Sequence, residues 1–238
     1  MTTNAGDDDG ARTTGGVRER ARIEIVERAL ASAHRQLAEV GAAALSVRAV
    51  ARDLGMASSA IYRYFPSRDA LLTRLITDAY VDLADVARKA EQAVDRADHQ
   101  ERFRATARAT RRWAIADPHR YALLYGSPVP GYVAPVDTVE PAIAVGLLLL
   151  GAVDDAAASG ASLRAMPVRA GLSDEFAQLA QGLGASVAPG VLASGITAWT
   201  SLYGHLSFEL FGHLTNVVVD RDAWFETFLD EQIARIWG

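Results

Sequence analysis

The sequence predicts an all-α protein of nine to ten helices, with a small N-terminal domain of three helices and a larger C-terminal helical domain. Apolar residues recur at the 3.6-residue period of an amphipathic helix through most of the chain, whereas no segment keeps the alternation of apolar and polar residues that a strand requires. Half of the 238 residues are hydrophobic and 22% are charged, an ordinary balance for a globular chain. We expect residues 1–17 to form a disordered tail, residues 18–66 the first domain and residues 67–238 the second.

The composition excludes several kinds of site. The chain has no cysteine, which rules out disulfides, zinc–thiolate sites and thiol redox sensing. It contains no HExxH, GxSxG, dinucleotide-binding or Walker motif, so we expect no enzyme activity and no cofactor. Its polar start lacks the apolar segment of a signal peptide, and its longest apolar run, Ala142–Val153, is short of the roughly twenty residues that span a bilayer. We therefore expect a cytoplasmic protein without a membrane segment.

The first long helix is predicted to begin at Arg18 and to end at Gly41. Its apolar stripe has the period of a helix with one buried face and consists of Ile23, Val26, Leu30, Ala33 and Leu37. Arg18, Arg20 and Arg22 open this helix. They are candidates for an arm that reaches phosphates or the minor groove of DNA, and equally for a solvated helix start.

Residues 45–72, LSVRAVARDLGMASSAIYRYFPSRDALL, predict two short helices joined by a tight turn, which is the helix-turn-helix pattern. Ser46 is a favourable N-cap for the first helix, and Gly55 follows its last apolar residue, where a helix end often needs a left-handed residue. Ser58 or Ser59 can cap the second helix, which Pro66 ends. This second helix has only about seven residues, so it must be held by packing on its neighbours.

The run resembles the DNA-binding region of the tetracycline-repressor (TetR) family of bacterial transcription regulators. The resemblance covers residues 23–72 and rests on the apolar-x-x-apolar-Ala of the first short helix, on Gly55, on the small-Ser run, on Ile61-Tyr62-x-Tyr64-Phe65 and on Arg68-Asp69-x-Leu71-Leu72. Tyr64 stands where His is common in the family and Arg68 where Lys is common, and both replacements keep a donor that can reach a phosphate. The resemblance implies a DNA-binding domain followed by a C-terminal half that dimerises and binds a small molecule.

We expect the helix over Ser58–Tyr64 to enter the major groove of double-stranded DNA. Ser59, Tyr62 and Arg63 are hydrogen-bond donors on its polar side and are expected nearest the bases. The remaining predicted contacts, to phosphates, are Arg48, Tyr64 and Arg68, and Arg48 can alternatively reach a guanine edge.

The charge distribution supports a local attraction to DNA. Residues 18–79 contain ten Arg against seven acidic residues, whereas residues 80–238 contain thirteen basic and nineteen acidic residues. A basic N-terminal segment in an otherwise acidic chain favours a DNA-binding surface confined to the first domain.

The rest of the chain is predicted to be helical throughout. The expected helices span residues 69–95, 103–115, 119–125, 143–158, 174–183, 191–218 and 223–237. A proline-rich loop, Ser127–Pro135, lies between the third and fourth of these, and the fourth is apolar nearly all round, which is typical of a buried central helix.

The helix predicted over Val191–Val218 is a candidate dimer interface. Three glycines within one helix are costly and indicate close approach by another helix, which is either a second copy of the chain or an internal neighbour. The resemblance implies a dimer through a four-helix bundle made by the last two helices of each subunit. The expected interface residues are Gly204, His205, Phe208, Gly212 and Phe228. Trp199-x4-Gly204 is also similar to the Trp-His-Gly type of C-terminal domain, although Tyr203 replaces the His.

His205, Glu209 and His213 share one face of the same predicted helix. This spacing allows a metal site, and it equally suits polar residues that bond across a dimer. We favour the second interpretation and predict no metal.

The middle helices carry more aromatic residues than a small bundle needs. The resemblance implies a ligand cavity among these helices, and the alternative for each aromatic residue is an ordinary place in the core. The expected ligand-binding residues are Phe103, Trp113, Tyr121, Tyr125, Tyr132 and Trp199. Because few charges lie among them, we expect a small apolar or aromatic effector.

The function predicted from the sequence is a ligand-responsive transcriptional repressor that binds a palindromic operator as a homodimer. The alternative is an architectural DNA-binding protein without an effector. Because one short recognition helix reads few bases, a two-fold dimer that reads two half-sites is the more effective arrangement.

Overall fold

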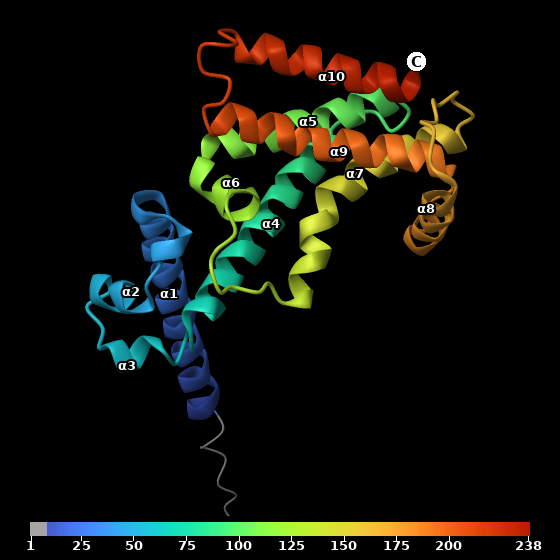
Figure 1. The fold of residues 1–238 in the computed structure, drawn as a ribbon. Coiled ribbons are helices and arrows are strands. Elements are labelled where there is room, and N and C mark those ends of the chain that lie inside the picture. Colours follow the sequence, from blue (N-terminus) through green and yellow to red (C-terminus); the bar gives the residue numbers. More distant parts are fainter. Residues whose placement is uncertain (1–8) are drawn as a thin grey trace, which may run out of the picture. The chain divides into compact units, whose positions relative to one another are not determined.

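The computed structural model describes the backbone of residues 9–238 (Figure 1) and the side chains of residues 18–238. Throughout this part of the chain the structure contains ten α-helices and two short 3-10 helices and no strand, which confirms the predicted fold class. The chain forms two compact units, one of residues up to 75 together with 128–133, the other of residues 76–127 and 134–238. Residues 1–8 of the predicted tail lie outside the described residues, and helix α1, Asp9–Val40, begins nine residues before the predicted start at Arg18.

The first unit contains α1, the 3-10 turn η1 (Ala42–Ala44), α2 (Val47–Asp53), α3 (Ser58–Ile61) and the first two turns of α4 (Arg68–Gln92). The predicted apolar stripe of α1 is buried only in its second half, at Ala33 and Leu37, whereas Ile23 is 49% exposed. This half of α1 packs on η1 and α2 in a small core. The buried residues of this core are Ala29, Ala33, Leu37, Leu45, Val47, Val50, Ala51, Ile61, Phe65, Leu71, Leu72 and Leu75.

The second unit contains the rest of α4, α5 (His99–Ala116), α6 (Pro118–Tyr125), the turn η2 (Val136–Thr138), α7 (Val139–Ala158), α8 (Ala170–Leu183), α9 (Pro189–Leu210) and α10 (Arg221–Trp237). Helix α9 contacts α5, α7, α8 and α10, so it is the central helix of this unit (Figure 1). Inside the unit a buried ion pair joins α4 to α5, because Arg102 Nε lies 2.6 Å from Glu91 Oε1 and both side chains are at most 5% exposed.

Two sequence predictions for this unit need correction. The helix predicted over Val191–Val218 ends at Leu210, because Gly212 and Asn216 take positive φ angles of 83° and 64°, which a helix cannot accommodate. The apolar segment around α7 is also longer than the predicted run, since Val136–Ala158 is long and apolar enough to cross a membrane by length and composition. One third (33%) of its apolar 18-residue window is buried inside the structure, where Val145, Leu149 and Ala152 belong to the core.

Candidate nucleic-acid interface and ligand pocket

The turn between α2 and α3 has the geometry that the sequence predicts. Ser46 caps α2, because its side-chain oxygen accepts a hydrogen bond from the Ala49 N–H. Gly55 follows α2 with a φ of 68°, and the amides of Gly55 and Met56 donate to the carbonyls of Arg52 and Ala51. This pair of bonds is a Schellman motif, which ends α2 sharply and turns the chain into α3.

Two partly buried hydrogen bonds fix α2 against α1 in the first unit. Ser32 is fully buried and donates to Asp53 Oδ2 at 2.7 Å, and the side-chain oxygen of Gln36 accepts from the Ser46 N–H at 3.1 Å. These bonds to α1 thereby set the direction in which the helix-turn-helix segment presents its exposed residues.

Helix α3 is shorter than expected, at four residues, and the chain continues as turns to Phe65. Ile61 and Phe65 are buried in the core of the unit and anchor this segment. The predicted base-contacting residues Ser59, Tyr62 and Arg63 lie on its solvent side and are exposed, and Ser58 beside them is exposed as well.

Arg48 and Arg52 are both exposed on α2. Because they are four residues apart they share one face of that helix, and two cations in this arrangement suit the DNA backbone. The sequence interpretation named only Arg48, although the i, i+4 spacing could have identified Arg52 as well.

Arg68 has a different environment from the one expected. Its guanidinium donates to the carbonyl oxygens of Ala42 and Ala43 at 2.8 and 3.0 Å, and to that of Leu45 at 3.1 Å. These bonds join the start of α4 to the turn η1 that follows α1. Nε and Nη2 of Arg68 are therefore engaged within the protein, while Nη1 lies 3.8 Å from Asp69 Oδ1.

Tyr64 is also drawn inward, since it is half-buried and lines a hollow with Ile23, Val26 and Leu30 of α1.

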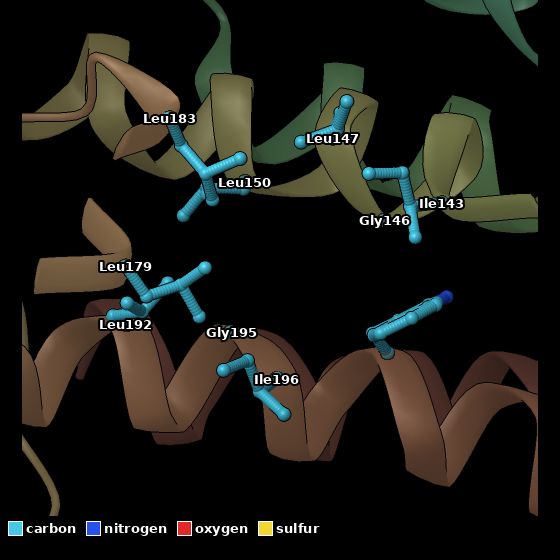
Figure 2. A pocket seen from close by; sticks show the side chains of 10 residues that line it. Ile143, Gly146, Leu147, Leu150, Leu179, Leu183, Leu192, Gly195 and Ile196 are labelled. Carbon is cyan, nitrogen blue, oxygen red and sulfur yellow. The ribbon is translucent and has the colours of Figure 1, made fainter. Parts of the chain in front are cut away.

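The second unit contains an apolar pocket of about 190 Å³ between α7, α8 and α9 (Figure 2). In Figure 2 the labelled side chains converge on it from these three helices. Its lining residues are Ile143, Gly146, Leu147, Leu150, Leu179, Leu183, Leu192, Gly195, Ile196 and Trp199.

Only one of the six predicted ligand-binding residues, Trp199, lines this pocket. Phe103 lies in the core with its ring 5.7 Å from that of Trp237. Trp113 donates its indole N–H to Asp82 at 2.8 Å. Tyr132 belongs to the first unit, where its hydroxyl lies 2.9 Å from the hydroxyl of Thr73.

Tyr121 and Tyr125 form an aromatic cluster with Tyr203, and the rings of Tyr125 and Tyr203 stack with centroids 4.1 Å apart. Tyr121 is buried, donates to the Tyr203 carbonyl and lies within hydrogen-bonding distance of Ser207. Burial raises the pKa of Tyr121 to about 12 and raises the pKa values of Tyr125 and Tyr203 further, so all three phenols stay neutral at physiological pH.

The glycine that matters most for the pocket is one that the sequence interpretation did not single out. A Cβ atom on Gly146 would lie 3.1 Å from two carbon atoms of the Trp199 ring, so this glycine lets the indole lie against α7. On α9, by contrast, Gly195 and Gly204 meet no such close neighbour.

The predicted interface residues lie on α9, on α10 and in the turn between them. Phe208 is 56% exposed, although it is large and apolar, and Gly204 is exposed too. His205 lies among aromatic rings of α10, with its ring centroid 4.6 Å from that of Phe228. Gly212 starts the turn after α9.

His205, Glu209 and His213 do not come together as a metal site. Both carboxylate oxygens of Glu209 accept hydrogen bonds from Arg111, at 2.7 and 2.9 Å, and His213 contacts the ring of Phe208. Within residues 9–238, as far as their side chains are described, the structure contains no group of three or more His, Asp or Glu side chains suited to a metal ion.

Comparisons with known proteins agree with the geometry of both units. Residues 29–75 match the family "Bacterial regulatory proteins, tetR family", and residues 103–232 match "Tetracyclin repressor-like, C-terminal domain". The chain is 41% identical over 202 residues to the HTH-type transcriptional regulators Rv1816 of Mycobacterium tuberculosis and Mb1846 of Mycobacterium bovis, covering 83% of this chain and 85% of each relative. The crystal structure of SCO4313, described as a regulatory protein, superposes with a TM-score of 0.75 at 34% identity and covers 91% of this chain and 98% of its own. The chain therefore belongs to the TetR family of DNA-binding transcriptional regulators.

Proposed function

We propose that this protein is a repressor that binds a palindromic operator as a homodimer and leaves it when a small apolar molecule enters the α7–α8–α9 pocket. The observation that carries the effector part of the proposal is the pocket itself, whose ten lining residues are all apolar or glycine. Open apolar space costs packing energy in a core, and binding sites are the usual reason for its presence.

For the DNA part, the exposed residues of the helix-turn-helix segment supply the contacts. Arg63, Tyr62 and Ser59 lie on the solvent side of the α3 segment and are assigned to base edges, with Ser58 beside them. Arg48 and Arg52 are assigned to phosphates. Tyr64, half-buried at the edge of this surface, is assigned a minor contact to DNA. Arg68 is assigned the structural role of joining the start of α4 to η1.

The homodimer is supported by the exposed apolar surface of α9 and α10. Phe208, Phe211 and Trp224 are each more than 40% exposed, and large apolar residues on the surface favour a protein partner. Gly204 leaves open space beside them for a second copy of α9. The Trp199-x4-Gly204 spacing is consistent with a C-terminal domain of the Trp-His-Gly type, and a DNA-binding regulator of this kind acts in the cytoplasm.

Helix α4 provides a covalent connection for the response, because it contributes residues 68–75 to the first unit and residues 76–92 to the second. A ligand changes operator affinity only if it binds one arrangement of the dimer better than the other.

Two measurements test this function. Fluorescence anisotropy at physiological salt compares the region upstream of the gene with random DNA of the same length, and a regulator is expected to prefer its operator by about 10³-fold or more. A flat ratio would favour the alternative of an architectural protein.

The second measurement asks whether filling the pocket abolishes the response to a small molecule. Gly195→Leu places a side chain in the pocket, where the nearest atom to a new Cβ is Leu150 Cδ1 at 3.9 Å. Gly151→Leu is the matched control on α7, outside the pocket and with open space around a new Cβ. The first variant is expected to bind the operator but no longer to release it with lipophilic compounds, and the control to respond as the unmodified protein does.

A further inference from the structure

We propose that the effector is a neutral, mainly apolar molecule that carries one hydrogen-bonding group, held by a polar corner made of Trp199, Tyr203 and Tyr125. This inference rests on the proposed function of the α7–α8–α9 pocket as the effector site, and it adds the chemistry of the molecule that fits there.

The size and lining of the pocket define the body of the ligand. An apolar cavity of about 150 Å³ can hold benzene, so a space of about 190 Å³ admits a slightly larger body of the size of a fused bicyclic ring. Leucine and isoleucine side chains from three helices surround this space (Figure 2).

The lining also defines the charge of the ligand. No lining residue is charged, so a carboxylate or a phosphate would lose its hydration without gaining an ion pair. A neutral molecule pays no such cost, which favours neutral ligands over fatty acids and other anions.

The polar corner lies at the Trp199 end of the pocket. Trp199 lines the pocket, its ring centroid lies 6.3 Å from that of Tyr203, and the Tyr203 ring stacks on that of Tyr125. The Tyr203 hydroxyl faces the polar groups of both neighbours. Even so, Trp199 Nε1, Tyr203 Oη and Tyr125 Oη are all buried without a hydrogen bond of acceptable geometry.

Three buried polar atoms that have only poorly oriented contacts with one another are unusual in a protein core, and their lost hydrogen bonding costs free energy. A ligand that supplies a partner removes part of this cost, which gives it a reason to bind beyond its apolar contacts. Because the three atoms are covered in the present arrangement, the indole and phenol groups must turn toward the pocket to meet the ligand.

The chemistry of the corner limits the hydrogen-bonding group. The indole N–H is only a donor, whereas each phenol can donate or accept, and burial raises the pKa values of both phenols, which keeps them protonated. A hydroxyl or carbonyl oxygen on the ligand can accept from the indole and exchange a second bond with Tyr203.

The inference is tested by isothermal titration calorimetry of the full-length protein with 2-naphthol, 2-methylnaphthalene and 2-naphthoate. The first two have nearly the same shape, and an entirely apolar site would prefer the methyl compound by about 0.8 kcal/mol, or roughly fourfold. We expect the unmodified protein to bind 2-naphthol at least as tightly as 2-methylnaphthalene, and 2-naphthoate at least tenfold more weakly than either.

Two variants assign the preference to the corner. Trp199→Phe and Tyr203→Phe are each expected to weaken 2-naphthol binding by roughly 2- to 12-fold, the range of one hydrogen bond, while 2-methylnaphthalene stays within about threefold of its original affinity. Tyr203→Phe removes a single oxygen atom, so it provides the readout if the larger change prevents folding.

Tighter binding of the methyl compound by the unmodified protein would overturn the inference, as would the absence of binding by all three compounds. An equal loss for both neutral compounds in both variants would overturn it as well. Binding that follows the expected order without operator release would instead refute the repressor mechanism and leave the ligand chemistry standing.

Discussion

Replacing Arg68 separates a structural role from a DNA-contacting one. Its guanidinium makes three hydrogen bonds of 2.8–3.1 Å to carbonyl oxygens of residues 42, 43 and 45, and 30% of its side chain is exposed. Each bond from a charged donor contributes about 1.5 kcal/mol or somewhat more, and water can replace part of that at a partly exposed site. We therefore expect Arg68→Ala to lower the free energy of unfolding by roughly 2–4 kcal/mol.

Urea denaturation followed by circular dichroism measures this loss, and Arg68→Lys is an informative intermediate. A lysine keeps the charge but lacks the planar fork of donors, so we expect it to recover only part of the stability. Arg48→Ala is the matched control, because Arg48 is exposed, and its stability is expected to stay within about 0.5 kcal/mol of the original.

The salt dependence of DNA binding decides between the two roles. Loss of one phosphate contact lowers the slope of log K against log salt by about 1. We expect that change for Arg48→Ala and not for the folded fraction of Arg68→Ala. An Arg68→Ala protein of unchanged stability with a reduced slope would refute the structural assignment and restore the phosphate contact predicted from the sequence.

Three further predictions concern the reading surface, the dimer and pH. Arg63→Ala is expected to relax sequence preference by about 1–3 kcal/mol in anisotropy titrations, and equal losses on operator and random DNA would contradict its base contact. Phe208→Asp should weaken self-association at least tenfold in analytical ultracentrifugation with little change in monomer stability, because this side chain is 56% exposed. Burial lowers the pKa of His205, with Arg111 adding to the effect and Glu209 opposing it, so the unfolded chain binds the proton more readily. The free energy of unfolding should therefore fall as pH drops below about 6.5, and His205→Gln should flatten that fall in melting experiments.

The sequence predicted best those features that depend on local chemistry. Ser46 and Gly55 act through their own backbone and their nearest neighbours, so the cap and the turn could be located from residue type and spacing alone. The fold class followed in the same way, because helical periodicity is a property of each segment by itself.

The features that escaped prediction depend on contacts between distant segments. The guanidinium of Arg68 binds carbonyls more than twenty residues away, which no local pattern encodes. Aliphatic residues line most of the pocket, and Trp199 is the one predicted aromatic among them, whereas the tyrosines of α6 and α9 pack against one another in the core. Gly146 could have been noticed as a glycine within an apolar helix, but its purpose became visible only with Trp199 opposite to it.

Helix α8 gives the pocket a wall that is only weakly held. Ala180 is the one residue of α8 that is buried, whereas Leu172, Leu179 and Leu183 are each about two-fifths exposed. Because these leucines are already partly exposed, local opening of α8 requires less free energy than unfolding of the whole unit. The pocket can therefore expand to hold a larger effector. Effector affinity should level off with increasing molecular size instead of ending abruptly, and one regulator can respond to a graded series of compounds.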